Sequence, residues 1–147
     1  MVSDTRIYVC HESHDSVYAE RLSDWRRTGV DQALYEQRER FAPDDPAADA
    51  LRSALRAAIW DADVVVCILS QGTSRAAWIN WELRQARSDG ATTPLVGIEL
   101  REPVRHPPAM VGVGAIFVPF RRDAIERAIQ WAVTERHLSG DFSLLDD

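Results

Sequence analysis

The stretch that decides the fold is DVVVCILS, residues 63–70. Its apolar residues follow one another without the alternation of a strand that has one face in water. The run is short for a helix and is rich in valine and isoleucine, which favour strands. We therefore predict a strand that is covered on both faces and lies at the centre of a parallel sheet.

Shorter apolar runs stand on both sides of this strand, and segments with the period of a helix separate them. The predicted strands are residues 6–10, 33–37, 63–70, 94–100 and 115–120. Strands that alternate with helices predict an α/β fold. We expect a flavodoxin-like, doubly wound, five-stranded parallel sheet with strand order 2-1-3-4-5 and helices on both faces. In that order a ligand binds at the carboxyl ends of the first and third strands.

Local signals predict where the helices begin. Asp45 followed by Pro46 marks a helix start, because the carboxylate caps free amides and proline at the first position loses no hydrogen bond. Thr73 and Ser74 are predicted to cap the helix that follows the central strand. The last helix is predicted to turn an apolar stripe inward, made of Ile125, Ala128, Ile129 and Ala132.

The bulk composition limits what the chain binds. Its 147 residues are 46% hydrophobic, which predicts a single domain over 1–147 with a core at about 5–137 and a mobile tail at 138–147. The net charge of −6 and the lack of a dense basic cluster argue against nucleic acid. All 17 basic residues are arginine, which excludes Schiff-base chemistry and the lysine of a P-loop.

The amino-terminal residues MVSDTR lack the apolar stretch of a signal peptide, and no apolar run is long enough for a membrane helix. We therefore expect a cytoplasmic protein without a membrane partner. Cys10 and Cys67 each lie in an apolar run without a second cysteine at metal-ligand spacing, and we interpret both as reduced core thiols.

Residues 78–86, WINWELRQA, combine two tryptophans with one carboxylate on a predicted helix. At 100° per residue, Trp78 and Trp81 lie beside the arc that faces the sheet, and Glu82 falls on the border. A carboxylate there is expected to be partly desolvated against the indoles, which raises its pKa. The alternative is a solvent-facing glutamate that the helix dipole favours, with tryptophans that serve only the core and its rim.

The polar stretch HESHD, residues 11–15, crowds two histidines with two acids. Its histidines are three apart in a loop, whereas the zinc-protease helix needs them four apart, so we predict no metal. A polar lining for a ligand pocket and plain loop polarity both stay open. A phosphoacceptor receiver domain is excluded, because the central strand ends in Leu69 and Ser70 instead of aspartate and the chain has no lysine.

Several segments together resemble a Toll/interleukin receptor (TIR) domain, and the likeness is greatest to the short bacterial TIR-like proteins of the Thoeris anti-phage defence system. The resemblance covers about residues 5–100, and its most specific part is S-x-x-x-W-x-x-W-E at 74–82. The segments that carry it are RIYVCHESHD (6–15), LYEQRERF (34–41), IWDADVVVCILSQGTSRAAWINWEL (59–83) and PLVGIEL (94–100).

The resemblance implies an enzyme that cleaves the nicotinamide glycosidic bond of NAD, with NAD as substrate and no bound cofactor. Glu82 then matches the family's catalytic glutamate, and Trp78 matches the tryptophan four residues before it. The residues expected to contact substrate are Trp78, Trp81, Cys10, His11, Ser13, Arg38 and Ser70.

Two functions remain open at this point. The first is an NAD-consuming enzyme that makes a linear or cyclised ADP-ribose-derived signal, in anti-phage defence, for a separate effector protein. Family members of this kind often complete the active site by packing two domains together, so a second copy is an expected partner. The second function is a non-catalytic TIR interaction module that acts by homotypic assembly. The pair Glu82 and Trp78 separates the two, because a pure scaffold does not need it.

Overall fold

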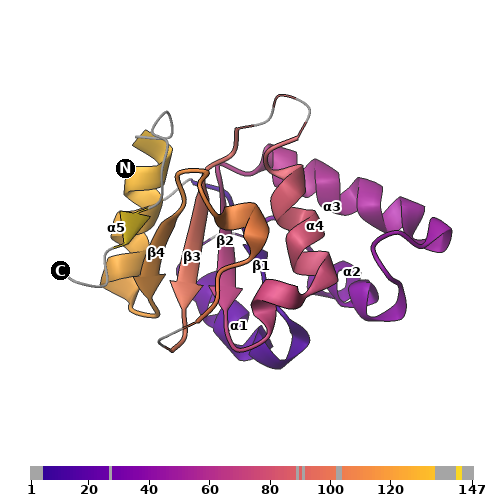
Figure 1. The fold of residues 1–147 in the computed structure, drawn as a ribbon, viewed down its shortest axis with the longest axis horizontal. Helices are drawn as coiled ribbons and strands as arrows, with labels where there is room; N and C mark the ends of the chain where they lie inside the picture. Colours follow the sequence, from indigo (N-terminus) through magenta and orange to yellow (C-terminus); the bar gives the residue numbers. More distant parts are fainter. Residues whose placement is uncertain are drawn as a thin grey trace.

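A parallel sheet forms the middle layer of the protein. The computed structural model describes residues 5–26, 28–88, 90, 92–101 and 104–134, and the backbone of 142–143. Four parallel strands lie side by side in chain order, and a two-residue strand pairs in parallel with the last of them (Figure 1). The strands are β1 (Ile7–Cys10), β2 (Val64–Leu69), β3 (Leu95–Glu99), β4 (Ile116–Pro119) and the short β5 (Phe142–Ser143).

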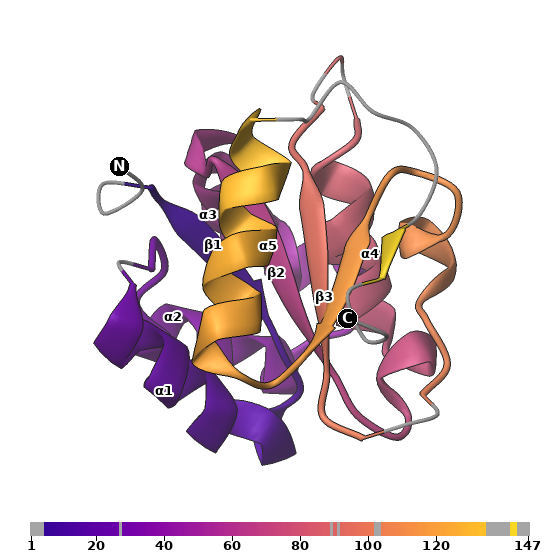
Figure 2. The ribbon, with the colours of Figure 1, turned by 90° about the vertical axis from the view of Figure 1, so that its left-hand side faces the viewer.

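Helices cover both faces of the sheet, as the sequence predicted (Figures 1 and 2). The α-helices are α1 (Ser16–Trp25), α2 (Gln32–Glu36), α3 (Asp49–Asp61), α4 (Ala77–Gln85) and α5 (Arg122–Thr134). Short 3-10 turns are η1 (Ser13–Asp15), η2 (Gln37–Arg40), η3 (Pro46–Ala48), η4 (Thr73–Arg75) and η5 (Pro108–Met110). Helices α1 and α5 pack on one face, and α2, α3 and α4 pack on the other. Within the described residues, no helix has the length and apolar character that a membrane crossing requires.

The central strand is β2, and all six of its residues are buried. Val65, Cys67 and Leu69 contribute to the core beneath α3 and α4, whereas the residues between them contribute to the core beneath α1 and α5. The unbroken apolar run therefore reflects two buried faces, and this prediction is confirmed. Both cysteines are buried and reduced, as predicted.

The predicted strand at 33–37 is wrong, because these residues lie in α2 and the start of η2. The edge beside β1 is occupied instead by a single parallel bridge between Ile7 and Thr28, and the Gly29 amide donates to the Ile7 carbonyl at 3.2 Å. Alanine, leucine, glutamine and glutamate all favour a helix, and no sheet edge remained to outweigh that preference. The five-stranded order 2-1-3-4-5 is therefore not found.

The helix signals had mixed outcomes. Asp45 starts η3 as predicted, since its Oδ1 accepts the Ala47 amide at 2.9 Å and Pro46 occupies the first position. Thr73 and Ser74 do not cap α4, which begins after Ala76 without a side-chain cap. The predicted inward stripe of the last helix is buried in α5. The predicted mobile tail at 138–147 lies outside the described residues, apart from the backbone of β5.

A close approach between β3 and β4 depends on a glycine. Gly97 is in register with Phe117, and a Cβ at Gly97 would lie 2.6 Å from Phe117 Cδ1. On the same ring, His106 stacks with 3.7 Å between centroids and an interplanar angle of 4°. His106 Nε2 also lies 2.9 Å from Glu99 Oε2. These contacts hold the loop that precedes η5 against the sheet.

Candidate active site

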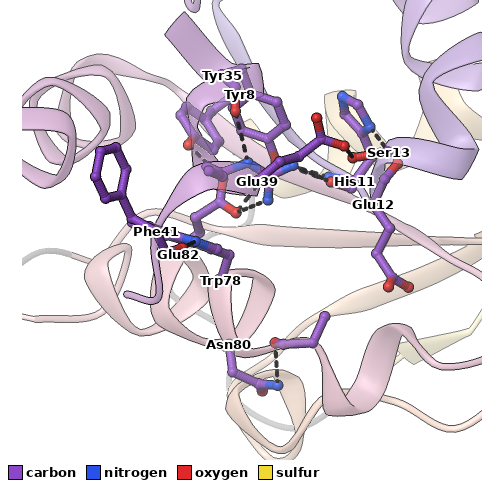
Figure 3. Close-up of polar contacts among 12 residues, drawn as sticks. Tyr8, His11, Glu12, Ser13, Tyr35, Glu39, Phe41, Trp78, Asn80 and Glu82 are labelled. Atoms are coloured by element: carbon purple, nitrogen blue, oxygen red, sulfur yellow. Dashed lines mark hydrogen bonds and ion pairs between the residues drawn. The ribbon is translucent and has the colours of Figure 1, made fainter. Parts of the chain in front are cut away.

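The Glu82 carboxylate lies inside the protein, on the side of α4 that faces β1 and α2 (Figure 3). Its exposed fraction is 0%. The Tyr8 hydroxyl donates to Oε2 at 2.5 Å, the Tyr35 hydroxyl donates to Oε1 at 3.3 Å, and Arg38 Nη1 donates to Oε1 at 3.0 Å. Both oxygens of the carboxylate therefore have partners that are themselves buried.

The partners of Glu82 come from three separate elements. Tyr8 lies in β1, Tyr35 in α2 and Arg38 in η2. Arg38 is held firmly, because Nη2 donates to the His11 carbonyl at 2.6 Å and Nε donates to the Tyr35 carbonyl at 3.1 Å. Its guanidinium also lies 3.6 Å from the centre of the Tyr35 ring. The segment that was predicted to be a strand thus supplies Tyr35, one of the three groups that hold the acid, and the turn that follows it supplies Arg38.

Burial raises the pKa of the Glu82 carboxyl above its ordinary value, and the Arg38 charge with the tyrosine hydrogen bonds offsets only part of the rise. Burial likewise raises the pKa of Tyr8, next to the charge of Glu82. The predicted direction for Glu82 is confirmed. Its cause is burial, and the hydrogen-bond partners found at the carboxylate are two phenols and a guanidinium.

A cavity of about 320 Å³ lies beside this network, at the carboxyl ends of β1 and β2. The residues that line it include Glu12, Ser13, Arg38, Glu39, Phe41, Ala76, Ala77 and Trp78. Its volume is at the lower end of the range for small-molecule sites. Glu82 is not part of the lining, and Arg38 contributes both to the lining and to the ion pair with Glu82. Arg38 therefore stands between the acid and the cavity.

The first turn of α4 also borders this cavity. Because α4 has no side-chain cap, its first amides keep unused donor capacity within the described part of the chain. The positive end of a helix favours negative charge, and phosphate groups often bind at such ends. Arg38 and the start of α4 thus give the cavity two features that attract an anion. The carboxylates of Glu12 and Glu39, which also line the cavity, oppose that attraction.

The two tryptophans pack against each other edge to face, with 5.4 Å between ring centroids. Trp78 lines the cavity and donates from Nε1 to the Phe41 carbonyl at 2.7 Å. This hydrogen bond joins two residues of the cavity lining, one from α4 and one from the segment after η2. Trp81 is buried away from the cavity, and the Arg56 guanidinium lies 5.5 Å from its ring centre.

The other predicted contact residues divide into two groups. His11 and Ser13 lie near Arg38, line a neighbouring cavity of about 230 Å³ together with it, and Ser13 also hydrogen-bonds to Glu39. Burial lowers the pKa of His11. Cys10 and Ser70 lie outside both cavities, because Cys10 is fully buried in the core and the Ser70 hydroxyl donates to Asp15 at 2.5 Å.

The HESHD stretch brings Glu12, His14 and Asp15 together, with one possible ligand atom from each within 4.8 Å of the others. Hydroxyl groups satisfy the acids, since Thr73 donates to Glu12 at 3.0 Å and Ser70 donates to Asp15. The absence of a metal site stays a prediction. These contacts tie the loop after β1 to the loop after β2, which borders the cavity.

Sequence reasoning missed Tyr8 and Tyr35. A tyrosine inside a buried strand carries a hydroxyl that needs a partner, and this was the available signal for Tyr8. Tyr35 was missed because residues 33–37 were predicted to form a strand, and a strand there gave no reason to expect a contact between Tyr35 and Glu82.

Residues 8–104 match the family model described as Thoeris protein ThsB, TIR-like domain. The search of curated proteins gave no match. The matched region includes most of β1 and all of α2, η2 and α4, and it contains all four residues of the Glu82 network. The chain belongs to the family of Thoeris ThsB TIR-like domains.

Proposed function

We propose that this protein cleaves the nicotinamide glycosidic bond of NAD and makes an ADP-ribose-derived signal in anti-phage defence. One observation carries the proposal: a buried carboxylate with a raised pKa lies directly behind Arg38 and α4, which line a cavity at the carboxyl ends of β1 and β2. An acid with a perturbed pKa beside such a cavity is a common mark of an active site. Membership of the Thoeris TIR-like family supports the same assignment.

The residues suit the chemistry. Departure of neutral nicotinamide leaves positive charge on the ribose, and a carboxylate stabilises that charge by pairing with it and by accepting hydrogen bonds from the ribose hydroxyls. A single acid suffices, because the pyridinium leaves without being protonated. A cationic ring beside Glu82 also favours the ionised carboxylate, which counteracts the effect of burial on its pKa.

In this arrangement Glu82 does not reach the cavity, so turnover requires a movement of Arg38. The segment that must shift is η2 with Phe41, which carries Arg38 and forms part of the cavity lining. Assembly with a second copy or a phage-derived trigger would supply the free energy for that movement. The product then reaches a separate effector protein as a diffusible nucleotide.

A second candidate function is a non-catalytic interaction module. The observation in its favour is that both carboxylate oxygens of Glu82 accept hydrogen bonds from buried side chains of the protein itself, as in a structural ion pair. In that case the network holds β1, α2 and α4 together, and the domain acts through its surfaces.

The deciding experiment incubates the purified protein with NAD, alone and with lysate of phage-infected cells. Nicotinamide is measured by chromatography and the sugar product by mass spectrometry. We expect release of nicotinamide that Glu82→Gln abolishes and that Glu20→Gln, an exposed glutamate on α1, leaves unchanged. Turnover that survives Glu82→Gln would overturn the site. No turnover under either condition favours the interaction module.

A further inference from the structure

A second and larger cavity, of about 560 Å³, lies at the carboxyl ends of β2 and β3. The loop after β2 and the segment after β3 form it. Its lining consists of Gln71, Gly72, Ser74, Arg75, Arg101, Val104 and Arg105. None of these residues lines the cavity beside Glu82, so the two are separate spaces. The volume lies within the range of sites that enclose small ligands.

Three arginines converge on this cavity in a protein whose net charge is −6. Across the described ranges of the chain, the side chains of Arg75, Arg101 and Arg105 have no hydrogen bond and no ion pair. Other arginines of the protein, such as Arg38 and Arg52, donate to an acid or to a backbone carbonyl. Like charges around one cavity repel each other, and a bound anion removes that cost.

The chemistry of the lining selects the class of anion. A guanidinium donates in a fixed fork that matches two oxygens of a phosphate, and several such forks suit a group with more than one phosphate. Gly72 has φ of +95°, and a Cβ placed there would meet nothing within 4 Å. The backbone of this turn is therefore open towards a ligand. Val104 adds one apolar surface to the lining.

From these observations we propose that the cavity formed by Arg75, Arg101 and Arg105 binds a small molecule that carries a diphosphate group. The site is independent of the proposed cleavage of NAD, since it contains neither Glu82 nor Arg38. It adjoins the same loop from the other side, because Ser74 and Arg75 line this cavity and Ala76 and Ala77 line the one beside Glu82. A diphosphate here contacts the segment that leads into α4.

The test is calorimetric titration of the whole protein with inorganic pyrophosphate. We expect saturable binding whose Kd rises about tenfold or more in Arg75→Ala and in Arg101→Ala, the loss of roughly one strong contact each. Arg84→Ala, an exposed arginine on α4, is the matched control and should leave the Kd unchanged. Circular dichroism checks that each variant is folded, and Arg101→Lys, which keeps the charge, should recover part of the affinity.

Glu82→Gln separates this proposal from the proposed function, because that variant should lose NAD cleavage and keep pyrophosphate binding. The proposal is overturned if the unmodified protein gives no saturable heat up to about 10 mM pyrophosphate. The same result is expected if the three arginines bind an acidic protein surface instead. Equal weakening by Arg84→Ala and Arg75→Ala overturns it too, since the attraction is then one of overall charge. Loss of binding in Glu82→Gln would place the anion in the other cavity.

Discussion

Removal of the Arg38 side chain tests the electrostatics of the Glu82 network. In Arg38→Met, the carboxylate keeps its hydrogen bonds from Tyr8 and Tyr35 but loses the guanidinium 3.0 Å away. Two unit charges about 4 Å apart in an effective dielectric of about 20 attract by about 4 kcal/mol. Breaking a buried pair by removing one partner typically costs about 3–5 kcal/mol. We therefore expect the free energy of unfolding to fall by about 4 kcal/mol at a pH where Glu82 is ionised.

The loss should depend on pH in a definite direction. The folded pKa of Glu82 is already raised above its ordinary value of 4.5, and loss of Arg38 raises that pKa further. Between the unfolded and the folded pKa the native state holds the extra proton, so stability falls as the pH rises through that window. The destabilisation by Arg38→Met should be smaller at about pH 5 than at about pH 8, because protonation relieves the unpaired charge.

Urea unfolding followed by tryptophan fluorescence at both pH values measures this effect. Arg52→Met is the matched control, because Arg52 donates to the carbonyls of Pro43 and Asp45 without contacting a buried acid. Its cost should be the same at both pH values. In a Glu82→Gln background, Arg38→Met should cost at least about 1 kcal/mol less than in the unmodified protein. An equal loss at both pH values, with no coupling to Glu82, would refute the electrostatic reasoning.

Three further predictions concern packing and titration. Gly97→Ala should lower the free energy of unfolding by about 1–3 kcal/mol, because its Cβ meets the Phe117 ring in β4, and thermal unfolding will show whether the ring can yield. Trp78→Phe should cost about 1 kcal/mol in urea unfolding, since the Phe41 carbonyl loses its donor; no loss would mean that water replaces the indole. Burial lowers the pKa of His11, so the unfolded chain takes up the proton first and the free energy of unfolding falls as the pH drops below about 6.5. His11→Asn should reduce this dependence of the unfolding free energy on pH, as measured by urea unfolding across the acid range. An unchanged dependence would contradict the assignment.

The parts of the fold that the sequence predicted well are those with strong local patterns. The apolar run of β2, the Asp45–Pro46 start and the inward stripe of α5 each depend on residues close together in the chain. The failures depended on tertiary context. Residues 33–37 have only weak strand character, and the Thr28 bridge already occupies the edge of β1. Thr73 contacts Glu12 instead of the α4 amides, because the loop after β1 packs beside it.

The candidate site was predicted in part. Glu82 and Trp78 were identified from the resemblance, and Arg38, His11 and Ser13 do lie near one another beside the cavity. The helical wheel placed Glu82 on a border, although it is fully enclosed, because a wheel does not include side chains from other elements. The burial of the Glu82 side chain depends on Tyr35 and Arg38, and the α4 sequence alone does not predict that these two residues lie beside it.

The bond between Tyr8 and Glu82 joins positions 74 residues apart in the chain. A contact of such long sequence separation has an entropic cost, because the intervening chain loses freedom when the two positions meet. The acid therefore acquires its perturbed environment only when β1, α2 and α4 have already docked. A nascent or partly unfolded copy holds an ordinary solvated glutamate, so the raised pKa of Glu82 is a property of the assembled domain and not of the α4 segment alone.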